Sequence, residues 1–173
     1  MRKKMKTEHW LNFFRLPLIV TILVTIFDQL TKIIISREII ENRESIPVID
    51  GFFNIVHTKN PGAAWGMFGE HTNILAFISL TAAILMIIFF RKLAEEKTVQ
   101  AVGITLIIGG TIGNMIDRFY LNHVTDFLSF TFGSYQFPAF NVADSSITIG
   151  VVIYAFGSLN LFSKTKPAGN SSE

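Results

Sequence analysis

Four aspartates lie in or beside strongly apolar stretches of this 173-residue chain: Asp28, Asp117, Asp126 and Asp144. A carboxylate near lipid is costly to place, so ionisable residues in such positions usually carry a function. Two carboxyls held close together cannot both ionise cheaply, and they therefore share one proton. One carboxyl can then act as a base on water while the other acts as an acid on a carbonyl oxygen, which is how two carboxyls hydrolyse an amide bond.

Two of these aspartates follow an asparagine by three residues: Asn114 precedes Asp117, and Asn141 precedes Asp144. Residues at this spacing share one face of a helix, and an amide N–H can donate to a carboxylate and fix its rotamer. Asp144 falls in the first turn of an expected helix, where the positive end of the helix dipole favours an anion. We therefore expect Asp144 to ionise more readily than Asp126.

Each aspartate also has a purely structural interpretation, and the residues alone do not choose between the two. The structural interpretations are an i, i+4 ion pair of Asp28 with Lys32, a buried pair of Asp117 with Arg118, a solvated loop position for Asp126 and a helix cap for Asp144. Physical reasoning alone therefore indicates a polytopic membrane protein with several carboxyls on its outer face.

The composition predicts lipid as the solvent, because half of the residues are hydrophobic and only 16% are charged, against about 25% in soluble domains. About 20 apolar residues cross the hydrocarbon of a bilayer. The first apolar stretch ends in "FDQLTK", without the small residues of a cleavage site, so we expect a retained helix rather than a signal peptide. The predicted fold is mainly α, with transmembrane helices at about 16–36, 74–91, 98–116 and 141–162 of a single domain, 1–173.

Ten of the 15 Lys and Arg residues lie in the tail 1–15, in the loop between the second and third helices, or in the tail 163–173. Cytoplasmic segments are enriched in Lys and Arg, so both termini are predicted to be cytoplasmic. Segments 36–73 and 117–141 then face outward. The run "SIPVIDGFFNIVHTKN" predicts two or more strands at the membrane surface.

Five motifs occur in order along residues 18–160: "FDQLTK", "NPGAAWG", "GGTIGNMIDR", "VTDF" and "FPAFNVADSSITIG". The set resembles the lipoprotein signal peptidases, also called signal peptidase II. Thr125 stands where that family usually has Val, and Pro61 stands where Thr is common. Neither difference removes a reacting group.

The resemblance implies an aspartic endopeptidase that cleaves bacterial prolipoproteins just before a diacylglyceryl-modified cysteine. It assigns catalysis to Asp126 and Asp144. It also implies four transmembrane helices, a small extracytoplasmic β-sheet and a short periplasmic helix between the third and fourth spans. Supporting or substrate-binding roles are implied for Asp28, Asn60, Gly62, Asn114, Asp117, Arg118 and Asn141.

The expected partners are diacylglyceryl-modified prolipoproteins, membrane lipid and globomycin-type inhibitors, with no nucleic acid and with a monomeric enzyme. The chain has no cysteine, and its four histidines lack a zinc-binding spacing, so no metal or cofactor is expected. The expected location is the bacterial inner membrane, with the active site at its periplasmic face. An ion-coupled carrier and a catalytically inactive relative are the two alternatives.

Overall fold

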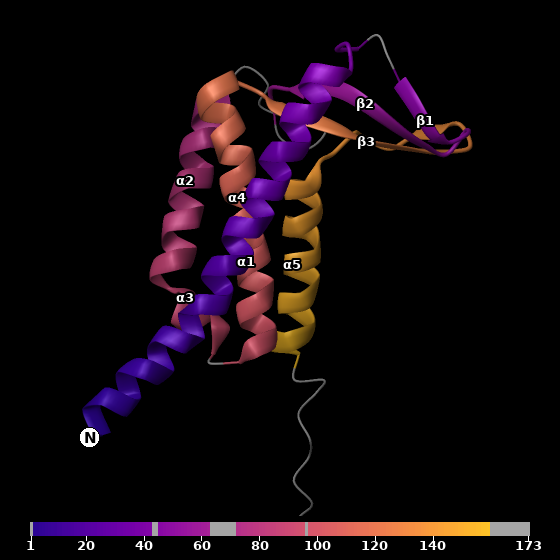
Figure 1. Cartoon of the computed structure of the whole chain (residues 1–173). Coiled ribbons are helices and arrows are strands. Elements are labelled where there is room, and N and C mark those ends of the chain that lie inside the picture. Colours follow the sequence, from indigo (N-terminus) through magenta and orange to yellow (C-terminus); the bar gives the residue numbers. More distant parts are fainter. Residues whose placement is uncertain (1, 43–44, 63–71, 96, 160–173) are drawn as a thin grey trace, which may run out of the picture.

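The structure is a computed structural model that describes residues 2–42, 45–62, 72–95 and 97–159, with the side chains of the first helix described from Phe14 onward. Long helices stand side by side, and a small sheet projects from one end of them (Figure 1). The elements are α1 (Arg2–Glu38), β1 (Ser45–Ile49), β2 (Phe53–Asn60), α2 (Thr72–Ile88), α3 (Phe90–Ala94), α4 (Thr98–Leu121), β3 (Val124–Phe132), β4 (Tyr135–Gln136) and α5 (Val142–Ser158).

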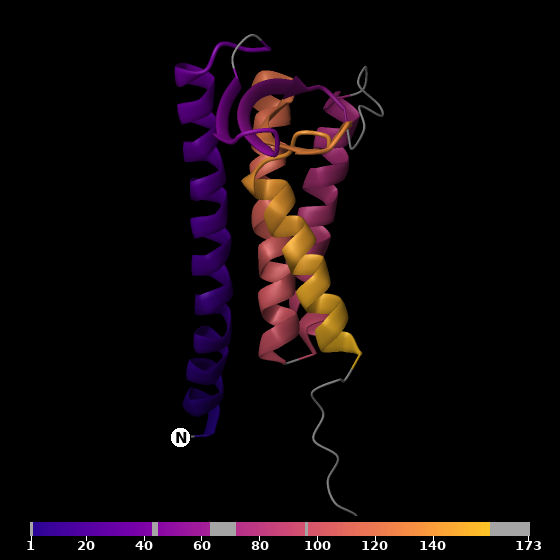
Figure 2. The same cartoon turned by 90° about the vertical axis from the view of Figure 1, so that its right-hand side faces the viewer.

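Helix α4 is the centre of the bundle, because it packs against α1, α2, α3 and α5 (Figure 2). Its contact with α5 is close enough for the two backbones to meet. A Cβ added to Gly103 would lie 2.8 Å from the Gly150 carbonyl oxygen, and one added to Gly150 would lie 2.6 Å from the Gly103 oxygen. Small residues allow this approach, which is typical of helix packing in membranes.

Helix α1 is joined to α4 by side chains spaced four residues apart. The Thr25 hydroxyl donates to the Gly109 carbonyl at 3.1 Å, and the Gln29 amide donates to the Gly113 carbonyl at 3.1 Å. A spacing of four keeps these donors on one face of the helix. In an apolar surrounding, such interhelical hydrogen bonds supplement packing as the force between helices.

The outer faces of the helices are apolar. Leu23, Phe77 and Ile88 are each at least 60% exposed, and many other large aliphatic side chains of the helices are exposed with them. A soluble surface rarely carries so much contiguous apolar area. Within the part of the chain that the structure describes, two helical segments are long and apolar enough to cross a membrane, Phe14–Glu38 and Thr98–Leu121, while α2 and α5 are apolar but shorter.

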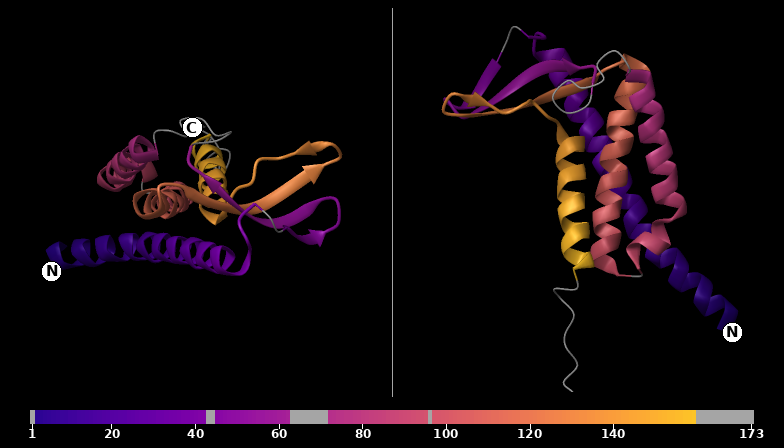
Figure 3. Two further views of the ribbon diagram at one scale, coloured as in Figure 1. Left: turned by 90° about the horizontal axis from the view of Figure 1, so that it is seen from above. Right: turned by 180° about the vertical axis from the view of Figure 1, so that it is seen from behind.

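The sheet is antiparallel with the strand order β1-β2-β3-β4, and it extends sideways from the helix ends (Figure 3). The turns after β1 and β3 contain Gly51 and Gly133, both with positive φ. Phe53 and Phe130 stack across the β2–β3 pair with ring centroids 4.6 Å apart. This pairing places Thr58 opposite Asp126 and so fixes Asp126 at the base of the sheet.

The prediction of a short helix between the third and fourth spans is wrong. Residues 122–141 are all described, and they contain β3 and β4 instead. The segment "VTDFLSFTF" is rich in β-branched and aromatic residues, which favour strands. Gly133 then supplies the left-handed turn that reverses the chain.

Two element boundaries also differ from the sequence-based expectation. Helix α1 continues from Arg2 instead of starting near residue 16, and α4 continues to Leu121 instead of ending near 116. Asp117 and Arg118 therefore lie within α4, near its end. Residues 63–71, which hold most of "NPGAAWG", and the expected tail 163–173 lie outside the described residues.

Candidate active site

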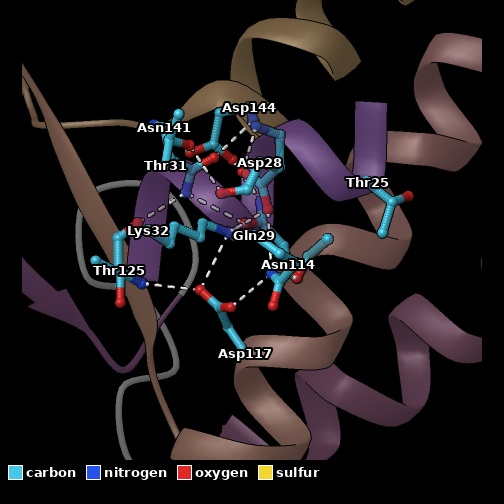
Figure 4. Close-up of polar contacts among 12 residues, drawn as sticks. Thr25, Asp28, Gln29, Thr31, Lys32, Asn114, Asp117, Thr125, Asn141 and Asp144 are labelled. Atoms are coloured by element: carbon cyan, nitrogen blue, oxygen red, sulfur yellow. Dashed lines mark hydrogen bonds and ion pairs between the residues drawn. The ribbon is translucent and has the colours of Figure 1, made fainter. Parts of the chain in front are cut away.

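The four aspartates singled out from the sequence converge where the ends of three helices meet the sheet. Asp28 comes from α1, Asp117 from α4, Asp126 from β3 and Asp144 from α5. Figure 4 shows Asp28, Asp117 and Asp144 among the polar side chains that gather here from α1, α4 and α5. The four aspartates divide into two groups with different surroundings.

The first group is a closed cluster built on Lys32, whose side chain is 4% exposed. Its ammonium lies 2.8 Å from the Asp28 Oδ2 and 3.0 Å from the Asp117 Oδ2. The other Asp28 oxygen accepts the backbone N–H of Ala143 at 2.9 Å, at the start of α5. Asp28 thus links α1 to α4 through Lys32 and to α5 directly.

Both carboxylate oxygens of Asp117 also accept hydrogen bonds. Its Oδ1 accepts the Gln29 amide at 2.9 Å, and its Oδ2 accepts the backbone N–H of Thr125 at 3.1 Å in addition to Lys32. The structural pair expected between Asp117 and the neighbouring Arg118 is therefore replaced by a pair with Lys32. The Arg118 guanidinium instead donates from Nη2 to the Gly62 carbonyl at 3.1 Å.

The second group is an open pair, Asp126 and Asp144. Asn141 is the N-cap of α5, and its side-chain oxygen accepts the Asp144 backbone N–H at 2.9 Å, while the Asp144 carboxylate accepts the Asn141 N–H at 3.3 Å. This reciprocal capping box holds the Asp144 carboxylate at the N-terminus of the helix. The capping interpretation of Asp144 is confirmed, and it leaves the Asp144 Oδ1 free for another donor.

The side-chain amides of the two asparagines donate crosswise, and neither of these amides donates to the aspartate three residues ahead of it. Asn114 Nδ2 on α4 donates to Asp144 Oδ1 on α5 at 2.7 Å. Asn141 Nδ2 donates to Asp126 Oδ1 on β3 at 2.7 Å. The spacing indicated correctly that amides would hold the carboxylates, but the partners were wrong because helix ends from different elements meet here.

Asp126 lies on β3 and is 3% exposed. Asn60 Nδ2 on β2 donates to its second oxygen at 3.0 Å, and the Asn60 side-chain oxygen Oδ1 accepts the backbone N–H of Gly62 at 3.0 Å. Burial, and then the negative charge of Asp144, raise the pKa of Asp126 to about 7, although the amide donors act in the opposite direction. A proton on Asp126 thus persists to neutral pH.

A cavity of about 620 Å³ opens beside the pair. The carboxyls of Asp126 and Asp144 both line it, whereas Asp28 and Asp117 do not. The remaining polar lining includes Asn60, Asn114 and Arg118, and the aromatic residues Phe137 and Phe140 form part of the apolar wall. The cavity therefore combines two carboxyls with an apolar surface, as cleavage of an apolar peptide segment would require.

Arg118 also brings an unused donor to this region. Its Nε is buried and has no hydrogen-bond partner among the described residues. A buried donor without a partner is costly, and it can be satisfied by a ligand carbonyl or by water. Arg118 is thus suited to contact a substrate backbone.

The structure brings all nine candidate residues predicted from the sequence into one region, although several of their hydrogen-bond partners differ from those expected. Lys32 and Gln29 also belong to this region, and the sequence did not lead us to include them among the site residues. Both lie on the same stretch of α1 as Asp28. The i, i+4 spacing of Asp28 and Lys32 was a usable signal for one of them. The role of the Thr125 backbone N–H left no trace in the sequence, because any residue type except proline supplies it.

No group of three or more His, Cys, Asp or Glu side chains within the described ranges could hold a metal ion. The carboxyls of the open pair are instead held by amide donors and by the start of a helix.

The fold and the cavity define a class of protein: a helical membrane protein with a small antiparallel sheet and two carboxyls facing a common cavity. The family model "Signal peptidase (SPase) II" matches residues 20–160. The chain therefore belongs to the signal peptidase II family, which consists of membrane proteases.

Named relatives and solved structures agree with this assignment. The chain is 42% identical over 147 residues to the lipoprotein signal peptidase of Desulforapulum autotrophicum, covering 82% of this chain and 90% of the relative. It is 37% identical over 145 residues to that of Staphylococcus aureus, covering 84% and 88%. A bacterial membrane enzyme solved by the in meso method is 35% identical, with a TM-score of 0.78 over 91% of this chain and 94% of that one.

Proposed function

We propose that this protein removes the signal peptide from bacterial prolipoproteins by cleaving just before a diacylglyceryl-modified cysteine, and that Asp126 and Asp144 are its catalytic pair. The observation that carries the catalytic assignment is that these two carboxyls alone, among the four converging aspartates, line the cavity. Asp28 and Asp117 are held by Lys32 outside it.

The reaction needs one ionised and one protonated carboxyl. Asp126 supplies the acid, because its raised pKa of about 7 keeps a proton on it near neutral pH. Asp144 supplies the base, because it lies at the N-terminus of α5 and accepts the Asn114 amide.

The steps follow from these protonation states. Asp144 takes a proton from a water molecule as the water oxygen attacks the scissile carbonyl carbon, and Asp126 gives its proton to the carbonyl oxygen. The tetrahedral intermediate then collapses: Asp144 returns its proton to the leaving amine nitrogen, and Asp126 regains a proton from the intermediate. The products are a carboxylic acid and an amine, and both carboxyls return to their starting states.

The substrate class suits a site at the membrane boundary. The acyl chains of a lipid-modified peptide can stay in hydrocarbon while its backbone enters a cavity at the ends of the helices. Asn60 and Arg118 line that cavity and can bind backbone groups. Cyclic peptides of the globomycin type are proposed to block the same cavity.

We further propose that α1, α2, α4 and α5 all cross the bacterial cytoplasmic membrane, with both termini cytoplasmic and the sheet at the outer face. Helices α2 and α5 have 17 residues each, at the lower end of the range of about 17–25 that spans a bilayer. The chain has no cysteine, so single introduced cysteines report topology without background. An impermeant maleimide should label Ser134→Cys in intact cells and Glu95→Cys only after permeabilisation.

The test of the activity is cleavage of a purified diacylglyceryl-modified prolipoprotein by the purified protein, with the new N-terminus identified by mass spectrometry. Cleavage before the lipid-modified cysteine, blocked by globomycin, is the expected result. Cleavage elsewhere, or none by a folded protein, would refute the proposed activity. Family membership disfavours an ion-coupled carrier, and the same assay distinguishes an active enzyme from an inactive relative.

A further inference from the structure

Lys32 occupies an unusual position for a lysine, because it is buried among polar groups of other elements and does not reach the cavity. Its residue is 3% exposed, and it is absent from the cavity lining. Besides its two ion pairs, the ammonium donates to the Asn114 side-chain oxygen at 2.9 Å. Lys32 therefore touches a residue that itself touches the open pair.

The contact with Lys32 decides which way the Asn114 amide points. Its oxygen accepts from Lys32 at 2.9 Å and from Asn141 Nδ2 at 3.2 Å, so its NH₂ group is left to donate to Asp144 Oδ1 at 2.7 Å. A flipped amide would aim its NH₂ group at an ammonium, which has no acceptor, and its oxygen at a carboxylate. Lys32 thus excludes the orientation in which Asp144 would lose its donor.

The Asn114 amide is linked to both carboxyls of the pair, to Asp144 directly and to Asp126 through the Asn141 amide. Asn141 Nδ2, which donates to Asn114 Oδ1, also donates to Asp126 Oδ1. Lys32 is consequently hydrogen-bonded to one of the two asparagines that hold the carboxyls, Asn114, and it is linked to the other, Asn141, through the Asn114 oxygen that both donors share. Figure 4 shows this arrangement, with Lys32 lying between Asn114, Asp117 and Asp28.

We propose that Lys32 is a positioning residue of the peptidase reaction: it fixes the amide of Asn114, and through it the rotamer of the Asp144 carboxylate. This inference rests on the proposed function, since it concerns the same catalytic pair. If Lys32 were only an ion-pair partner of Asp28, its loss would lower stability alone. The proposal predicts that its loss also lowers the turnover rate of the folded enzyme.

The direct test is the rate of prolipoprotein cleavage by Lys32→Met at saturating substrate. Misplacement of a reacting group by about 1 Å can cost on the order of a hundredfold in rate. We expect kcat to fall between about tenfold and a hundredfold, with KM close to wild type because Lys32 does not line the cavity. The pH profile is a second readout: Asp144, Arg118 and Lys32 are charges that act on Asp126, and removing the Lys32 cation should move the alkaline limb to higher pH.

Removing Lys32 alone leaves the carboxylates of Asp28 and Asp117 without their cation, so the variant could fail to fold. The double variant Lys32→Met/Asp28→Asn avoids this, because it removes one positive and one negative charge and leaves the net charge of the cluster unchanged. The kcat of this double variant should be lower than the kcat of Asp28→Asn alone, because only the double variant lacks Lys32. Equal kcat values for these two variants would overturn the proposal.

A matched control is Gln100→Met at the opposite end of the bundle. Gln100 is 1% exposed, and its amide donates to the Gly157 carbonyl at 3.0 Å. This variant loses a buried polar contact between helices without touching the pair. It should lower the melting temperature while leaving kcat and the pH profile at wild-type values.

A double-mutant cycle with Asn114→Ala tests the route of the effect. If Lys32 acts through Asn114, Lys32→Met should add little further loss of kcat in the Asn114→Ala background. A full additional loss there, or a folded Lys32→Met with kcat within about twofold of wild type, would overturn the proposal. Wild-type cleavage in the same assay would show that the proposed function stands even then, whereas a failure of the wild type itself would count against the proposed function.

Discussion

The closed cluster (Asp28, Lys32 and Asp117) and the open pair (Asp126 and Asp144) use the same chemical group in opposite ways. In the closed cluster, each carboxylate meets a buried ammonium and further N–H donors. In the open pair, the donors are neutral amides and a helix N-terminus, and the carboxyls face a cavity. A cation stabilises the ionised form, whereas a second carboxyl without one favours a shared proton. The surroundings therefore separate structural from reactive aspartates.

The largest expected effect is the loss of activity when either carboxyl of the open pair is neutralised. Asp126→Asn and Asp144→Asn should each reduce prolipoprotein cleavage by at least about a thousandfold, because neither the acid nor the base of the reaction can be replaced by an amide. Gel mobility of the substrate measures cleavage. The melting temperature in detergent, measured on the same samples, should show that both variants remain folded.

Substitutions in the closed cluster should lower the stability of the protein more than they lower its activity. Asp28→Asn leaves Lys32 with one carboxylate and weakens the acceptor of the Ala143 N–H, and breaking one partner of a buried ion pair costs about 3–5 kcal/mol. The expected result is a clear fall in melting temperature, with cleavage retained at a temperature where the variant is folded. Complete inactivity of a folded Asp28→Asn protein would break the distinction between the two groups.

The pH dependence of cleavage should have an alkaline limb set by Asp126. Its pKa is raised to about 7, so below that pH it holds the proton that the reaction needs, and above it the rate should fall about tenfold per pH unit. A steady-state pH profile of kcat/KM measures the limb. A rate that stays flat from pH 6 to about pH 9 would exclude Asp126 as the acid.

The same raised pKa predicts a change in stability of definite sign. The folded state holds the Asp126 proton more tightly than the unfolded chain, so this carboxyl contributes its full stability at low pH and loses it as the pH rises toward about 7. The wild-type melting temperature should therefore fall across this window, and Asp126→Asn should remove that component of the decline. An unchanged decline in the variant would assign it to another group.

The smallest effect is expected at the ion pair of Lys59 with Glu41, which sharpens the contrast with Lys32. These side chains are 44% and 35% exposed, although their charged atoms lie 2.6 Å apart. Water and salt screen such a pair, so its contribution to stability is small. Glu41→Gln should leave both the melting temperature and cleavage within error of wild type, and a loss as large as that of Asp28→Asn would contradict the comparison.

The helices could be predicted from the sequence because they are long apolar runs, and the strands of the first outer segment because their residues favour extended structure. The second outer segment misled the prediction: the helix expected there came from the resemblance, while its own residues, "VTDFLSFTF" ending at Gly133, favour a strand and turn.

At the site, residue types could be predicted but partners could not. The four aspartates and their asparagines stood out because polar residues are rare in apolar surroundings. The crosswise pairing of Asn114 with Asp144 depends on how α4 packs against α5, to which Gly103 and Gly150 contribute far from the site. Local spacing carries no information about such contacts between elements.

The most direct test of the proton-sharing pair is the titration of the Asp126 carboxyl carbon by NMR in protein labelled at aspartate side chains, with the signal assigned by its loss in Asp126→Asn. It should titrate near pH 7, and its midpoint should fall in Asp144→Asn, because the charge of Asp144 is one cause of the raised pKa. An Asp126 carboxyl that titrates near pH 4, the value of an ordinary aspartate, would contradict the proposed division into acid and base.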